Sequence, residues 1–306
     1  MVQLQPIAFL RSPEACSRQW RLSESLSYTR WLATHHYENF HVVSLLLPRH
    51  LHQDFYNVYA FCRWADDLGD ETGDPQESLR LLAWWRGELE RLFAGQPPSH
   101  PVFVALAETV RRHDLPVEPF SDLIDAFIQD QTVTRYRDWD GVLDYCRRSA
   151  NPVGRLVLML CGYRDAERFR LSDATCSALQ LANFWQDVAV DLEKNRIYLP
   201  LRLLEAHGCS EQDLFARRCT PAFRRAMLAA VDYAQALFEQ GLPLSRMVDR
   251  RLALDIDLFS RGGMKVLDKI RAQNYDVLSR RPAISKTERA LLLLGSLARL
   301  AFRRAA

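Results

Sequence analysis

Residues 172–192 read SDATCSALQLANFWQDVAVDL. At about 100° per residue, Gln180, Asn183, Phe184, Asp187 and Asp191 share one sector of roughly 100° on a helix. Most of the other positions are apolar, and the polar strip holds amides and carboxylates where a solvated helix face would carry Lys, Glu and Arg. The stretch therefore predicts a helix inside a bundle, with a narrow polar lining along one side.

The same helical period continues through the rest of the sequence. Apolar residues recur at spacings typical of helices, and alternating or β-branched runs bounded by turns are nearly absent. The Pro- and Gly-containing connectors are short, and none resembles an interdomain linker. We therefore expect an all-α protein with a single domain of about ten or more helices. The pair Asn151-Pro152 is compatible with either a helix kink or a fresh helix start.

Bulk composition excludes several classes of protein. The 306 residues include 40 basic and 38 acidic side chains, so no global field attracts the chain to nucleic acid. The seven cysteines are scattered without a CxxC pair, which argues against a disulfide framework and a zinc site. The sequence shows no secretory signal and no window with the roughly 20 apolar residues that span a bilayer. We expect a cytoplasmic protein that does not bind nucleic acid.

A second acidic pair lies within residues 52–70. Phe55, Tyr59, Cys62, Asp66 and Asp70 share a helical sector of roughly 80°, so the two carboxylates continue an apolar stripe. An exposed acidic helix end is the common explanation for such a pair. If the pair faces inward, however, two like charges one turn apart are costly unless a cation lies between them. Oxygen ligands suit Mg²⁺, which commonly bridges carboxylates and phosphates, so the two acidic pairs together predict a diphosphate bound through metal.

Basic residues flank both acidic pairs. Arg63 precedes Asp66 by one turn, and Lys194, Arg196 and Tyr198 follow Asp191. The planar guanidinium of arginine binds phosphate oxygens through two hydrogen bonds. A surface salt bridge is the usual role of a single arginine, but the coincidence with two acidic pairs favours a clamp on a leaving diphosphate.

Longer motifs around these residues resemble the squalene/phytoene synthase family. YAFCRWADDLGDE at 59–71 is similar to the first aspartate-rich signature of the family, and QLANFWQDVAVDLEKNRIYLP at 180–200 is similar to the second. DYCRRSANPVG at 144–154 occupies the place of the family's Tyr-Cys segment. HYENFHVVSLLLP at 36–48 and FSRGGMKVLDKI at 259–270 extend the match. The resemblance implies one isoprenoid-synthase (prenyltransferase) helical bundle with a central cavity, over residues 1–306.

The resemblance also implies roles for individual residues. It assigns Mg²⁺ binding, with Mn²⁺ as a substitute, to Asp66, Asp70, Asn183, Asp187 and Asp191. It assigns catalytic roles to Tyr59, Arg63 and Tyr145. The substrate pocket contains these three residues together with Asn39, Asp130, Gln180, Arg196 and Tyr198.

Departures from the wider family pattern resemble the hydroxysqualene synthase branch. HYENF stands where many members have HSxSF, SANPVG replaces VAGxVG beside Tyr145, and Gln186 stands where squalene and phytoene synthases commonly carry Arg. The branch implies conversion of presqualene diphosphate to hydroxysqualene in hopanoid biosynthesis, with release of diphosphate and capture of water. Tyr59, Tyr145 and Phe184 would stabilise the intermediate cation through their ring faces, and no nicotinamide is expected.

Two other functions remain open. One is the head-to-head coupling of two prenyl diphosphates, which gives presqualene diphosphate, squalene or phytoene in this family. The other is a non-catalytic scaffold, although the intact acidic pairs argue against it. The Leu- and Arg-rich stretch 285–304 begins with a Ser-x-x-Glu capping box and fits a packed terminal helix. It also fits transient contact with the inner face of the membrane, and the sequence leaves open a hand-off of product to neighbouring pathway enzymes.

Overall fold

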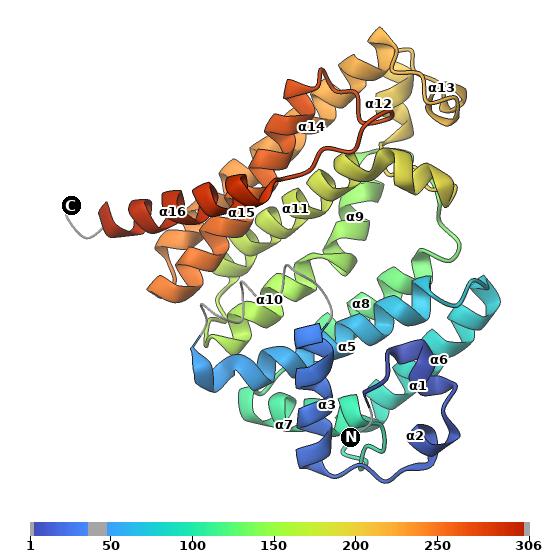
Figure 1. Ribbon diagram of the computed structural model, residues 1–306, viewed down its shortest axis with the longest axis vertical. Coiled ribbons are helices and arrows are strands. Elements are labelled where there is room, and N and C mark those ends of the chain that lie inside the picture. The colour runs from blue at the N-terminus through green and yellow to red at the C-terminus, as the bar shows by residue number, and fades with distance from the viewer. Residues whose placement is uncertain (1–2, 36–47, 303–306) are drawn as a thin grey trace. The chain divides into compact units, whose positions relative to one another are not determined.

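A computed structural model describes residues 3–35 and 48–302 of the chain (Figure 1). These described residues contain more than ten helices and no strand; Arg135 and Ile197 form an isolated parallel bridge. The all-α prediction is therefore confirmed. The chain divides into two compact units, Met1–Thr132 with Arg155–Arg164, and Val133–Gly154 with Asp165–Ala306. The expectation of a single domain stays a prediction.

The first unit is built around one central helix, α5. Its helices are α1 (Pro6–Leu10), α2 (Pro13–Ser17), α3 (Leu22–His35), α5 (His52–Asp70), α6 (Pro75–Phe93), α7 (Pro101–His113) and α8 (Glu118–Gln129), with a 3₁₀ turn, Arg49–Leu51, before α5. Helix α5 packs against α3, α6, α7 and α8. Trp64 of α5 stacks on Trp85 of α6 with ring centroids 5.2 Å apart, and both side chains are buried. Burial of these large rings fixes the orientation of α5.

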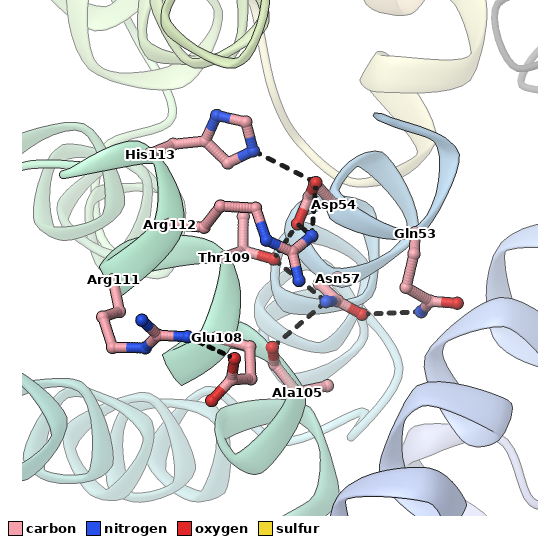
Figure 2. Close-up of polar contacts among 9 residues, drawn as sticks. All are labelled: Gln53, Asp54, Asn57, Ala105, Glu108, Thr109, Arg111, Arg112 and His113. Carbon is pink, nitrogen blue, oxygen red and sulfur yellow. Dashed lines mark hydrogen bonds and ion pairs between the residues drawn. The ribbon is translucent and has the colours of Figure 1, made fainter. Parts of the chain in front are cut away.

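A buried polar network joins α5 to α7 (Figure 2). Asp54 is 1% exposed and accepts hydrogen bonds from Thr109 Oγ1 at 2.9 Å and from Arg112 Nη1 at 3.0 Å. His113 Nε2 lies 3.1 Å from the same carboxylate, and Asn57 Nδ2 donates to Thr109 Oγ1 at 3.0 Å. A buried carboxylate is tolerated when it is paired and hydrogen-bonded. The network therefore fixes the register of α5 against α7 at the N-terminal end of α5, and Asp66 and Asp70 lie at the other end of the helix.

The second unit is built around the long helix α11. Its helices are α9 (Trp139–Ser149), α11 (Ala166–Glu193), α12 (Leu201–Ala206), α13 (Glu211–Phe215), α14 (Pro221–Gly241), α15 (Arg250–Ala272) and α16 (Lys286–Phe302), with a 3₁₀ helix, Leu242–Arg246, after α14. Helix α11 packs most extensively on α14 and also contacts α15 and α9. Trp185 Nε1 on α11 donates to the carbonyl of Ala230 on α14 at 3.0 Å.

Asn151 begins a new helix and does not kink an existing one. Helix α9 ends at Ser149, and α10 (Asn151–Leu160), which crosses the boundary between the two units, starts after a single turn residue. Ser177 Oγ on α11 donates to Asn151 Oδ1 at 2.9 Å. A Cβ atom at Gly154 would lie 2.4 Å from Ser172 Oγ, so the glycine permits the first turns of α10 to pack closely on α11. The SANPVG motif is thus a helix start fitted to α11.

Two adjacent glycines in α15 provide a test of this packing. A Cβ atom at Gly263 would lie 2.2 Å from Cζ of the buried Phe238, whereas a Cβ at Gly262 would meet nothing within 4 Å. Gly263→Ala is expected to lower the free energy of unfolding by about 1–3 kcal/mol because it overpacks the core. Gly262→Ala should raise it by about 0.5–1 kcal/mol because alanine favours a helix interior. Urea unfolding of both variants measures the difference, and equal effects would contradict the packing of α15 described here.

None of the helices in the described parts of the chain has the length and apolarity needed to cross a bilayer.

Candidate active site

The last two turns of α5 carry the acidic residues of the first unit. Arg63 Nη1 donates to Asp66 Oδ2 at 3.0 Å, and Arg63 Nη2 forms an ion pair with Asp67. The Asp66 side chain is 44% exposed and Asp70 is exposed, so both are accessible. The buried acid is Asp67, which the helical-sector argument did not select. Because α1, α3, α6, α7 and α8 all pack against α5, its buried arc is wider than the apolar stripe and includes position 67.

Burial controls the protonation of two of these side chains. It raises the pKa of the Asp67 carboxyl to about 6; the positive charge of Arg63 acts in the opposite direction, and the nearby acids add to the increase. Burial also raises the pKa of the Tyr59 phenol to about 12. Tyr59 therefore remains protonated at neutral pH, one helical turn before Arg63.

Asp130 lies at the end of α8 beside the same part of α5. Gln131 Nε2 donates to the carbonyl of Gly69 at 3.1 Å, and a Cβ atom at Gly69 would lie 3.6 Å from Cβ of Phe127. The last turns of α5 and α8 are therefore in contact. Asp130 is 8% exposed at this junction. In the first unit, Tyr59, Arg63, Asp66 and Asp70 thus follow one another along α5, and Asp130 lies at the end of α8 that contacts the last turn of α5.

The polar strip of the second unit runs along α11, and many of the residues on either side of it are buried. Asn183 is exposed and Gln180, Asp187 and Asp191 are partly buried, whereas Trp185 between them is fully buried. Both carboxylate oxygens of Asp187 accept hydrogen bonds from Arg281, from Nε to Oδ1 and from Nη2 to Oδ2, the latter at 3.1 Å. The predicted strip is therefore present, and it is open to solvent at Asn183.

The donor atoms of both acidic helices fit a hard divalent cation. All of them are carboxylate or amide oxygens, the ligands that Mg²⁺ prefers. Among the residues that the structure describes, no group of three or more His, Cys, Asp and Glu side chains is arranged to hold a metal ion by itself. Mg²⁺ usually takes one or two carboxylates and completes its coordination with water and phosphate oxygens. A carboxylate pair on a helix is sufficient for that mode of binding.

Four aromatic rings gather beside the polar strip. Phe184 of α11 stacks on Tyr198 with centroids 3.7 Å apart and an interplanar angle of 4°. Tyr145 of α9 lies 5.9 Å from Phe184 and 5.8 Å from Tyr198, and Tyr136 stacks on Tyr198 at 5.6 Å. All four side chains are buried. The cluster formed by Tyr136, Tyr145, Phe184 and Tyr198, here called the aromatic cluster, provides π faces suited to a cation.

Backbone pairing between two loop segments positions the aromatic cluster. Ile197 N donates to Thr134 O, and Leu201 N donates to Tyr136 O, both at 2.9 Å. The chain reverses after α11 at Asn195, which has a φ of 55°. Arg196 N donates to Asp191 O at 2.9 Å, which keeps Arg196 beside the acidic end of α11. The prediction from sequence missed Tyr136, because it lies outside any helix and no periodicity marks it.

The predicted site residues are divided between the two units. Tyr59, Arg63, Asp66, Asp70 and Asp130 belong to the first unit, and the second contains Tyr145, Gln180, Asn183, Asp187, Asp191, Arg196 and Tyr198. Asn39 and the HYENF motif lie outside the described residues. A cavity of about 530 Å³ in the first unit, beside Trp20, Trp84 and His100, is lined by none of the predicted site residues. The central cavity that the resemblance implies stays a prediction.

The helical architecture, with acidic residues on two helices and an aromatic cluster beside one of them, is that of an isoprenoid synthase. The family model for squalene/phytoene synthase matches residues 33–288, and the chain belongs to this family.

Individual relatives support the assignment. The phytoene synthase of Thermus thermophilus is 36% identical over 262 residues, covering 84% of this chain and 87% of the relative. The hydroxysqualene synthase of Rhodopseudomonas palustris is 34% identical over 279 residues, covering 89% of this chain and 92% of the relative. The crystal structure of squalene synthase HpnC from Alicyclobacillus acidocaldarius superposes with a TM-score of 0.79 at 49% identity, covering 83% of this chain and 95% of that one.

Proposed function

We propose that this chain is a magnesium-dependent hydroxysqualene synthase with a single squalene/phytoene-synthase domain. Its substrate is presqualene diphosphate, which it converts to hydroxysqualene with release of diphosphate and capture of water, in hopanoid biosynthesis. The observation that carries the proposal is that α11 holds a cation-stabilising aromatic ring and a candidate metal ligand close together. Phe184, part of the aromatic cluster, lies one helical turn before Asp187. Similarity to the hydroxysqualene synthase of R. palustris and the SANPVG motif support the choice of branch.

Metal binding is assigned to the oxygen donors of both acidic helices, Asp66, Asp70, Asn183, Asp187 and Asp191, with Mn²⁺ able to replace Mg²⁺. Bound metal supplies positive charge that stabilises the leaving diphosphate. Arg63 and Arg196 bind phosphate oxygens through their guanidinium groups and stabilise the same developing charge. Asn39, Tyr59, Asp130 and Gln180 orient the substrate.

The aromatic cluster stabilises the cyclopropylcarbinyl cation that remains after diphosphate leaves. Ring faces attract a cation by about 0.5–2 kcal/mol each, and the attraction is stronger where water is excluded. Tyr145, Phe184 and Tyr198 are buried and have their ring centroids within 5.9 Å of one another, so the cluster concentrates several ring faces and edges in one place from which water is excluded. Water captures the rearranged cation, and for that reason the reaction needs no hydride from a nicotinamide.

Head-to-head coupling of two prenyl diphosphates is the second candidate function. The 36% identity to the phytoene synthase of T. thermophilus favours it. The same acidic residues, arginines and aromatic cluster serve that reaction, because it also begins with loss of diphosphate. The two candidates differ in substrate and in the final step.

We also propose a cytoplasmic protein that contacts the inner face of the membrane transiently and hands an apolar product to neighbouring pathway enzymes. Leu291 and Leu294 of α16 are each 62% exposed. Ser285 and Glu288 form the capping box expected at the start of this helix. Arg299 pairs with the buried Asp257 of α15 at 2.7 Å, so α16 is also a packed helix.

Incubation of the purified protein with presqualene diphosphate and Mg²⁺ in ¹⁸O-labelled water tests the proposed function. Hydroxysqualene that carries the label is the expected product, with the same yield in the presence and absence of NADPH. Unlabelled squalene formed only with NADPH would identify a squalene synthase instead. Coupling of farnesyl diphosphate without consumption of presqualene diphosphate would identify an enzyme that makes presqualene diphosphate. Mass spectrometry of the extracted products distinguishes all three.

A further inference from the structure

The segment between α15 and α16 is tied to α11 at the candidate metal ligand Asp187. Arg281 uses Nε and Nη2 to bind both carboxylate oxygens of Asp187. Gln186, the neighbouring residue on α11, donates from Nε2 to the carbonyl of Pro282 at 2.5 Å. Two consecutive residues of α11 therefore hold two consecutive residues of this segment.

Internal hydrogen bonds give the segment a defined shape. Gln273 Nε2 donates to the carbonyls of Asp276 and Arg280, both at 2.9 Å. Ser279 N donates to Asp276 Oδ1 at 3.1 Å. Lys269 at the end of α15 pairs with Glu288 at the start of α16, with 2.9 Å between Nζ and Oε2. Arg281 is therefore held at Asp187 by a braced loop, which reduces the conformational entropy lost when the pair forms.

The pair at Asp187 conflicts with metal binding at the same carboxylate. Both oxygens already accept hydrogen bonds from the guanidinium, and a divalent cation at Asp187 would also lie close to the positive charge of Arg281. The Asp187 side chain is 17% exposed, whereas that of Arg281 is 51% exposed. Arg281 can therefore leave for water without opening the core, while Asp187 stays in place on α11.

We propose that Arg281 is a counter-ion latch: it occupies Asp187 in the metal-free protein, and a divalent cation must displace it. This inference rests on the proposed metal role of Asp187. Displacement of Arg281 removes the ion pair that links this segment to Asp187, whereas the bond from Gln186 to Pro282 is kept. Metal entry thus loosens residues 276–285, so the loop reports directly on the occupancy of Asp187.

Binding of Mn²⁺ alone, measured by electron paramagnetic resonance without any diphosphate, tests the latch. Arg281→Gln is expected to bind Mn²⁺ about fivefold more tightly than the unaltered chain, the scale of a partly exposed ion pair. Arg280→Gln is the matched control, because it removes the same charge from the exposed neighbouring position. It should change the affinity by less than about twofold. Asp187→Asn should weaken Mn²⁺ binding.

The outcomes separate failure of the latch from failure of the proposed function. If Asp187→Asn weakens Mn²⁺ binding but Arg281→Gln does not strengthen it, the latch is wrong and the metal role of Asp187 stands. If Asp187→Asn binds Mn²⁺ like the unaltered chain, the metal role itself is wrong. Amide hydrogen exchange gives a second readout that needs no variant. Exchange in residues 276–285 should accelerate when Mg²⁺ is added, and unchanged exchange would overturn the latch.

Discussion

Asp187→Asn is expected to lower turnover of the prenyl diphosphate by at least about 1,000-fold while the helical circular dichroism spectrum stays unchanged. The amide has the same shape as the carboxylate and keeps one oxygen acceptor for Arg281. It lacks the negative charge that a hard cation requires. Asp66→Asn should lower turnover in the same way, because Asp66 is also a proposed metal ligand. It should leave the fold intact, because the Asp66 side chain is accessible and not part of the packed core.

Steady-state kinetics with Mg²⁺, Mn²⁺ and excess chelator provide the measurement. Asp232→Asn is the control, because Asp232 pairs with Arg271 at 3.1 Å on the surface of α14 and is exposed there. It should leave turnover within about twofold of the unaltered chain, as expected for a surface ion pair. Full activity in excess chelator would show that the proposed metal dependence is wrong.

Asp54→Ala is expected to lower the free energy of unfolding by about 3 kcal/mol. Removal of this buried carboxylate leaves Thr109 Oγ1 without its acceptor and Arg112 and His113 without their anionic partner (Figure 2). The exposure of Arg112 allows its charge to be solvated, which keeps the cost at the lower end of the range for broken buried pairs. Chemical denaturation followed by circular dichroism measures the change.

Glu108→Ala on α7, the helix that carries Thr109, Arg112 and His113, provides the control. Glu108 also accepts a hydrogen bond from an arginine, Arg111 Nη2 at 2.9 Å (Figure 2). This pair is more exposed, with 74% of the Arg111 side chain and 34% of the Glu108 side chain accessible to solvent. Its loss should cost less than about 0.5 kcal/mol. Similar small changes for both variants would mean that the polar network between α5 and α7 does not anchor α5.

The sequence predicted the elements whose pattern is local. Helices α5 and α11 follow from the spacing of apolar and acidic residues, and the capping box at Ser285 follows from a four-residue motif. The sequence could not decide whether Asn151 kinks a helix or starts a new one, because the pair Asn-Pro is compatible with both. The contact with Ser177 on a different helix accompanies the fresh start.

The residues that sequence reasoning missed depend on long-range contacts. Asp67 was not selected because its burial depends on the several helices that pack around α5, which no single helical sector can represent. Tyr136 joins the aromatic cluster through backbone pairing with a segment that follows α11. Gln186 was identified as a departure from the family pattern, but its partner, Pro282, is separated from it by 96 positions. No local sequence pattern predicts a contact between residues so far apart in the chain.

The continuity of α11 has a kinetic consequence. Phe184 and Asp187 belong to one uninterrupted helix of 28 residues, so a shift or bend of that helix displaces both side chains together. In the proposed reaction, this continuity links ionisation of the substrate to the lifetime of the resulting cation. Substitutions that distort α11 should slow ionisation and also let more of the cation react to give by-products. The share of by-products should therefore increase as turnover falls. Substitutions on α9 at Tyr145 should alter the product ratio with a smaller change in the rate of ionisation.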